Sequence, residues 1–287
     1  MPEDEDKYPV ESDRRRFVKG VVGSAALAGV GTTGAAAIDS ATSRAGAGGG
    51  TTTYMAIENT DGPAPRGMPQ IPIEIEDGQV KGVWPEVQER ELDSGETIQV
   101  AETTNFKDTG LTYTNRWFQY CGVQSYPGLA PDADQDNFFR YSASPPPSYG
   151  WQGEETSGGD IVEVADFEDY EDYEGTGIGQ GGLGKPAVAT WRSQDVDSVI
   201  PVQIIRSPII EEMAQDDEWL AASTDQGFMA YLNKCTHFCC VPGWKSLESA
   251  AQFGAEDEVY CQCHQSIYDP FSLVERTFTA LPRPEDD

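Results

Sequence analysis

The chain has 287 residues, with 49 acidic against 19 basic side chains and a formal net charge of −30. Its length allows one or two domains with a real core, and its 38% apolar fraction excludes a wholly disordered acidic tail. The charge excludes a nucleic-acid-binding protein that works by phosphate neutralisation, and it disfavours docking onto anionic lipid. Only seven basic residues are Lys, a composition typical of a halophilic protein in which salt screens self-repulsion.

Residues 1–53 carry the signals of export and of membrane anchoring. A tail, residues 1–19, ends in Asp13-Arg14-Arg15-Arg16-Phe17-Val18-Lys19, which resembles a twin-arginine signal with Arg14 and Arg15 as its pair. Residues 20–38 carry no charge and, at ~1.5 Å per residue, nearly span a ~30 Å hydrocarbon core, which predicts a signal or anchor helix. The tail then stays cytoplasmic; cleavage of the helix is the alternative. Gly-rich residues 39–53 predict a flexible tether.

Residues 54–287 alternate β-rich runs with turn signals and predict an all-β head of sandwich or barrel type. One amphipathic helix is predicted over residues 209–222. An acidic insertion covers residues 150–184. Its part 154–174 holds ten acidic residues and no basic one, so we expect a solvated, partly disordered segment or a docking patch for a partner. Strands are expected over residues 71–75, 97–101, 116–120, 187–192, 201–205 and 227–232.

Cysteine and histidine gather near the carboxyl end of the head. Five of the six Cys and both His lie within residues 235–264, while Cys121 lies far upstream. The spacing is Cys-x-His, 23 intervening residues, and then Cys-x-x-His. Two thiolates with two imidazoles can ligate zinc, or a 2Fe–2S cluster in which one iron takes both Cys and the other both His. The pattern therefore predicts a metal site, a disulfide, or both.

This region resembles the cluster-binding loops of the Rieske iron–sulfur proteins of cytochrome bc-type complexes. The first motif reads Cys235-Thr236-His237-Phe238-Cys239-Cys240, and the second reads Cys261-Gln262-Cys263-His264-Gln265-Ser266-Ile267-Tyr268. The resemblance implies a 2Fe–2S cluster whose metal ligands are Cys235 and Cys261 on one iron, and His237 and His264 on the other.

The resemblance also implies roles for four neighbouring residues. Cys240 and Cys263 match a disulfide that ties the two loops together. Ser266 and Tyr268 match hydroxyls that hydrogen-bond the cluster sulfur and a ligand sulfur, which raises the reduction potential. The implied fold is a Rieske-type head, an antiparallel β sandwich or barrel base with a small cluster-binding subdomain at about residues 233–270.

The function implied is electron transfer within a membrane complex. The cluster accepts electrons from quinol bound in a partner cytochrome b and passes them to a c-type cytochrome or a small copper protein. His264 contacts the quinol and accepts its proton. The chain is then a redox subunit of a quinol–cytochrome c oxidoreductase-like complex and is not catalytic alone. We expect it at the cell membrane, with the head on the extracytoplasmic face.

Three departures and two alternatives stay open. Cys239 replaces a Gly of the family, and it competes with Cys240 for a disulfide or pairs with Cys121. A Gly-Pro-Ala-Pro loop is expected after the second motif, where only Leu281-Pro282-Arg283-Pro284 stands. The chain after His264 is only 23 residues long, so a closing strand is missing or comes from the amino-terminal half. The alternative functions are the Rieske small subunit of an exported molybdenum oxidase, similar to arsenite oxidase, and a structural zinc module.

Overall fold

The computed structural model describes residues 50–91, 95–143, 149–175 and 177–280. The chain divides into two units, Met1–Ser43 and Arg44–Asp287, and all described residues belong to the second. The export motif, the 20–38 helix and most of the tether lie outside the described residues. Within the described ranges, no helix has both the length and the apolar character to cross a membrane.

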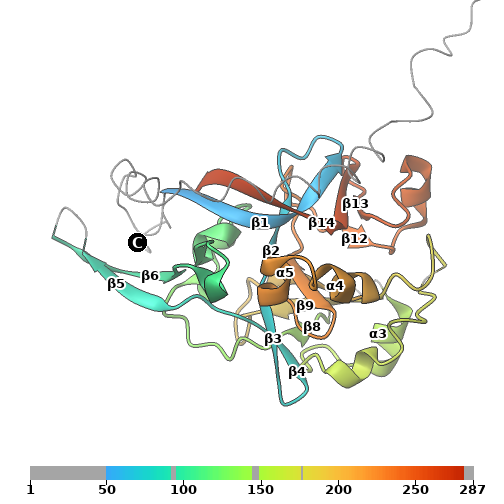
Figure 1. Ribbon diagram of the computed structural model, residues 1–287, viewed down its shortest axis with the longest axis horizontal. Helices are drawn as coiled ribbons and strands as arrows, with labels where there is room; N and C mark the ends of the chain where they lie inside the picture. Colours follow the sequence, from blue (N-terminus) through green and yellow to red (C-terminus); the bar gives the residue numbers. More distant parts are fainter. Residues whose placement is uncertain (1–49, 92–94, 144–148, 176, 281–287) are drawn as a thin grey trace, which may run out of the picture. The chain divides into compact units, whose positions relative to one another are not determined.

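The second unit is mostly β structure, as the sequence predicts, and consists mainly of antiparallel strands in a curled sheet (Figure 1). Nine strands hydrogen-bond in the order β12-β13-β14-β1-β2-β11-β10-β9-β8. These strands are β1 (Gly50–Asp61), β2 (Met68–Ile71), β8 (Arg140–Tyr141), β9 (Lys185–Trp191), β10 (Ile200–Arg206), β11 (Phe228–Leu232), β12 (Gly243–Trp244), β13 (Val259–Cys261) and β14 (Ser266–Ala280).

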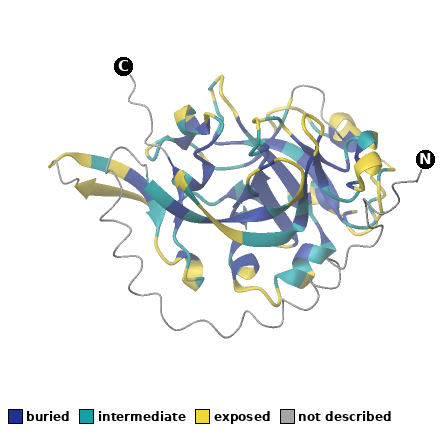
Figure 2. Ribbon diagram, turned by 90° about the horizontal axis from the view of Figure 1, so that it is seen from above, coloured by how far each residue is buried: buried dark blue, intermediate teal, exposed yellow. Residues whose placement is uncertain are grey.

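Two smaller sheets and three short α-helices complete the described fold. Strands β5 and β6 extend as an arm away from the curled sheet (Figure 1). Exposed residues gather toward the tip of this arm, whereas buried residues fill the central strands of the curled sheet (Figure 2). The small sheets contain β3 (Ile73–Glu76) with β4 (Gln79–Gly82), and β5 (Val87–Glu91) with β6 (Thr97–Thr103) and β7 (Tyr113–Thr114). The helices are α3 (Gly150–Glu155), α4 (Pro208–Met213) and α5 (Glu218–Ser223).

The long antiparallel pair β1–β14 lies inside the nine-stranded sheet. It connects β12 and β13 on one side with β2, β11, β10, β9 and β8 on the other. Its register runs from Gly50 opposite Ala280 to Asp61 opposite Ile267. Of the two possibilities left by the sequence, a strand supplied from the amino-terminal half is therefore the one found. Because β1 begins at Gly50, the last four residues of the predicted tether, 50–53, belong to this strand.

Two predicted elements are wrong. Residues 116–120 are not a strand: the 3-10 helix η3 (Asn115–Phe118) lies there, capped by the side chain of Thr114. Trp117 and Phe118 are both fully buried, which the alternating faces of a half-buried strand do not allow. The single helix 209–222 is two helices, because the side chain of Asp217 accepts a hydrogen bond from Leu220 N and starts a new helix.

The acidic insertion combines aromatic residues that pack against the core with acidic side chains that face solvent, because nine of the ten acids in residues 154–174 are exposed. Phe167 is buried, and Trp151 lies against it with ring centroids 5.2 Å apart. Lys185, only 3% exposed, places its ammonium 4.0 Å from the Trp151 ring centroid and 2.8 Å from a carboxylate oxygen of Asp169. The aromatic residues interleaved among the acids therefore serve the core.

Candidate metal centre

Three loops meet where the two halves of the curled sheet join. The first loop (residues 233–242) leads from β11 to β12, the second loop (residues 262–265) joins β13 to β14, and the third loop (residues 62–67) joins β1 to β2. The larger hydrophobic core, called here the base core, includes Trp117, Phe118 and Trp191. A second, separate core cluster lies beneath the loops and includes Met68, Tyr231, Trp244, Val259 and Tyr268. This packing fixes the strand ends from which the loops start.

The first and second loops are held by their own backbone hydrogen bonds. Cys235 N donates to Cys240 O at 2.7 Å, and Cys239 N donates to Cys235 O at 3.0 Å. In the second loop, Gln265 N donates to Cys261 O at 2.8 Å. Cys239 has a φ of 64°, in the left-handed region that a Gly adopts without strain. The loops are therefore closed turns that present short runs of side chains.

The structure brings together the four predicted ligand residues. Cys235 and Cys261 are free thiols and both are buried. The imidazole rings of His237 and His264 lie edge to face with centroids 4.8 Å apart. His264 is exposed, whereas His237 is partly covered and its Nδ1 is buried without a hydrogen-bond partner among the described residues. Two soft sulfur donors thus lie deep, the His237 imidazole is half-buried, and only the His264 imidazole is exposed.

Hydroxyl groups surround the deep sulfur atoms. The hydroxyl of Tyr268 donates to Cys235 Sγ at 3.2 Å and accepts from Thr236 N at 3.3 Å. Ser266 is fully buried, and its side chain is a further hydrogen-bond donor that lowers the pKa of the Cys235 thiol.

Contacts within the site shift the pKa of its thiols in opposite directions. A hydrogen bond with the Cys261 thiol, followed by one from Tyr268, lowers the pKa of Cys235 against the opposing effect of burial. The same contact with Cys235, together with burial, raises the pKa of Cys261. Their contact therefore favours the thiolate form at Cys235 and the thiol form at Cys261. Backbone N–H groups of Cys263 and His264 also point to the Cys261 sulfur.

Two disulfides surround the free thiols. Cys240 and Cys263 are bonded and join the first loop to the second; Cys121 and Cys239 are bonded and join the first loop to the base. The Sγ atoms of Cys240, Cys261 and Cys263 lie within 4.8 Å of one another, a group that could hold a metal ion. Since a disulfide sulfur is not a thiolate, that group offers only Cys261 while its two other members remain bonded.

The third loop is a wall of the site that sequence reasoning missed. A side chain at Gly62, whose φ is 83°, would collide with Gln265 O and the Cα of Ser266. The hydroxyl of Thr236 donates to Arg66 O at 2.5 Å. The signal for this loop is its sequence, because residues 62–65 read Gly-Pro-Ala-Pro, the run that was expected after the second motif and that lies in the amino-terminal half instead.

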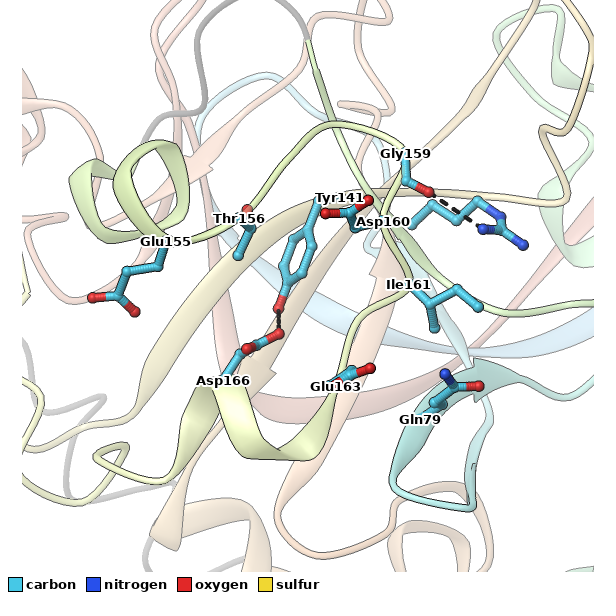
Figure 3. A pocket seen from close by; sticks show the side chains of 10 residues that line it. Gln79, Tyr141, Glu155, Thr156, Gly159, Asp160, Ile161, Glu163 and Asp166 are labelled. Carbon is cyan, nitrogen blue, oxygen red and sulfur yellow. Dashed lines mark hydrogen bonds between the residues drawn. The ribbon is translucent and has the colours of Figure 1, made fainter.

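An open pocket of about 500 Å³ lies away from this centre. Its lining includes Tyr141, Glu155, Glu163 and Asp166 but neither Cys nor His, and the Tyr141 hydroxyl donates to Asp166 at 2.8 Å (Figure 3). Of the acidic side chains in its lining, Glu155, Asp160 and Glu163 are exposed.

Comparison of the chain with protein-family profiles, curated proteins and solved structures finds no match. Functional inference therefore depends on the residues of the metal centre themselves.

Proposed function

We propose that this chain is a Rieske-type electron-transfer protein that binds a 2Fe–2S cluster between its first and second loops. Cys235 and Cys261 hold one iron, and His237 and His264 hold the other. The observation that carries the proposal is the pairing of two free buried thiols with two imidazoles whose centroids are 4.8 Å apart. When bound, the cluster supplies reversible one-electron chemistry.

The residues around the ligands fit such a cluster. Tyr268 supports a ligand sulfur through its hydroxyl, and the buried Ser266 side chain offers a second hydroxyl donor at the same Cys235 sulfur. Hydrogen bonds to the sulfur atoms also favour the reduced, more negative state and so raise the reduction potential.

The surface around the proposed cluster fits a neutral partner surface. Residues 62–73, 235–247 and 259–268 contain no Asp or Glu, although the chain holds 49 of them. Phe238 and Val241 are 65% and 57% exposed. Exposed apolar side chains within an acid-free area favour contact with a partner protein. We propose that this face docks onto a membrane cytochrome b, where the exposed imidazole of His264 accepts a hydrogen bond and then a proton from the quinol hydroxyl.

The remaining expectations complete the proposal. The head is the extracytoplasmic part of a subunit anchored in the cell membrane by residues 20–38, and its cluster-binding subdomain spans about residues 233–270. Its electron acceptor is a c-type cytochrome or a small copper protein. Exchange of Arg14 and Arg15 for Lys should leave the chain in the cytoplasm, and export of that variant at the normal level would contradict this route.

Electron paramagnetic resonance of the dithionite-reduced full-length protein, with iron and zinc analysis, tests the proposal. We expect two irons per chain and a Rieske signal with a positive midpoint potential. Cys235→Ala and His264→Ala should each abolish the signal, whereas Phe238→Leu, which keeps an apolar side chain at the rim, should retain it. Zinc in the wild-type protein without a Rieske signal would contradict electron transfer.

A further inference from the structure

A segment outside the two metal-binding motifs holds the first loop from behind. This segment, named here the brace, spans residues 113–129. It contains β7, η3, η4 (Val123–Ser125) and η5 (Pro127–Leu129), together with the short turns between them. Its side chains Trp117, Phe118 and Val123 are fully buried in the base core. The brace is therefore a fixed part of the base and is able to restrain whatever is attached to it.

Two successive residues of the brace attach to opposite ends of one short run of the first loop. The hydroxyl of Tyr120 donates to Lys234 O at 2.7 Å, immediately before Cys235. Cys121 forms a disulfide with Cys239, immediately after Phe238. Residues 235–238, which include both ligand residues of the first loop, thus lie between a hydrogen bond and a covalent bond to the same rigid segment.

Side-chain contacts strengthen the first of these attachments. The ammonium of Lys234 donates to the hydroxyl of Tyr126 at 2.7 Å and lies 5.0 Å from its ring centroid. Tyr120 is itself nearly buried, so its hydrogen bond is shielded from water. Lys234 therefore contacts the brace through both its main-chain carbonyl and its side chain.

The adjacent residues Cys239 and Cys240 form disulfides with two different parts of the protein. Cys239 is bonded to the base through Cys121, and Cys240 is bonded to the second loop through Cys263. The Cys240–Cys263 bond sets the two loops against each other but does not fix them to the base. Only the Cys121–Cys239 bond restrains the first loop against the base covalently, apart from the main chain itself, among the described residues.

We propose that Tyr120 and Cys121 are positioning residues for the metal centre, which fix residues 235–238 to the base and hold the His237 imidazole in its place beside His264. The proposal rests on the proposed function only in treating Cys235 and His237 as metal ligands. Restraint of the loop in the absence of metal follows from the contacts alone and is tested separately. The brace lowers the number of conformations that the first loop samples before metal binding.

Hydrogen exchange of the full-length, metal-free chain tests this restraint. The variant Cys121→Ala/Cys239→Gly removes the disulfide, leaves no free thiol, and places Gly where φ is 64°. We expect the amides of Cys235 and Cys239, both hydrogen-bonded within the first loop, to exchange about tenfold faster or more. In the iron-loaded variant, release of iron to a chelator should accelerate, and the resonance signal should broaden.

Gly158→Ala is the matched control, because a Cβ there meets Ala143, so the strain falls between two residues that lie outside the brace. Exchange in residues 235–239 that stays at the wild-type rate, or rises only as in Gly158→Ala, would overturn the proposal. If the double variant does not fold, Tyr120→Phe replaces it: faster exchange at Cys235 supports the brace, and an unchanged rate counts against it. A wild-type chain that binds no iron contradicts the proposed function but leaves the exchange result valid.

Discussion

The hydroxyl of Tyr268, at the start of β14, donates a hydrogen bond of 3.2 Å to the Sγ atom of Cys235 in the first loop. This bond joins β14 to the first loop, at the thiol of the pair whose pKa is lowered. Burial, and next the contact with Cys235, raise the pKa of Tyr268, so the phenol stays protonated and keeps donating.

Tyr268→Phe removes that donor while keeping the buried ring. We expect the midpoint potential of the iron-loaded protein to fall by roughly tens of millivolts, because the reduced state loses a hydrogen bond to a ligand sulfur. A redox titration followed by electron paramagnetic resonance measures the change. Tyr260→Phe, whose ring stacks on Phe253 instead, is the control and should leave the potential unchanged. Equal shifts in both variants would mean that the Tyr268 hydroxyl has no special effect.

Gly62→Ala tests the third loop as a wall of the centre. The new Cβ meets the backbone of Gln265 and Ser266, so we expect displacement of the second loop, a destabilisation of ~1–3 kcal/mol and a lower iron content. Gly78→Ala is the control, since its φ is also 83° but no atom lies within 4 Å of its Cβ. Chemical denaturation and iron analysis compare them. If Gly78→Ala loses as much iron, backbone strain and not the contact is responsible.

Asp269→Asn should stabilise the protein at neutral pH. Burial, and further the facing Glu58 in the β1–β14 pair, raise the pKa of Asp269, so its ionised form is disfavoured in the folded state. Its contribution is most favourable below the unfolded pKa and is lost as pH rises through the folded value. Asn keeps the acceptor for Phe271 N. Unfolding experiments should show a gain at pH 7 that shrinks toward pH 4, and a pH-independent difference would refute this.

Lys185 and Asp169 should respond unequally to neutralisation. Asp169→Asn leaves a buried ammonium without its carboxylate, whereas Lys185→Met removes the buried charge and leaves Asp169 in water, where its side chain is already 59% exposed. We expect a loss of about 3 kcal/mol for Asp169→Asn and about 1 kcal/mol for Lys185→Met. Denaturant unfolding at fixed salt measures both. The reverse order would show that the aromatic rings, and not the ion pair, stabilise Lys185.

Local sequence patterns predicted most of the strands but not the parts that depend on distant contacts. Strands near residues 97–101, 187–192, 201–205 and 227–232 are confirmed because their β-branched and apolar runs match the period of a sheet. Residues 71–75 divide into β2 and β3 at Pro72, which cannot donate a ladder hydrogen bond. The adjacent aromatics Trp117 and Phe118 suggest a strand locally, yet both are fully buried, Trp117 against Trp219 and Phe118 against Trp191.

The spacing of Cys and His predicted the candidate ligands, because two short motifs can be recognised in the sequence without knowing the fold. The third loop and the brace escaped prediction for a common reason: each reaches the centre through tertiary contacts from more than 100 positions away. Pairing of Cys121 with Cys239 was only one open possibility, since spacing carries no information on a bond across 118 residues.

The pairing of β1 with β14 has a consequence for biosynthesis. The hydroxyls of Thr53 and Thr277 lie 3.3 Å apart although 224 residues separate them in sequence. During translation, β1 leaves the ribosome first among the described strands and then waits, with one edge unpaired, until β14 has been made. A nascent chain that is interrupted at any point before β14 cannot close its sheet or complete the metal centre. An export machinery that accepts only folded cargo would thereby reject unfinished copies.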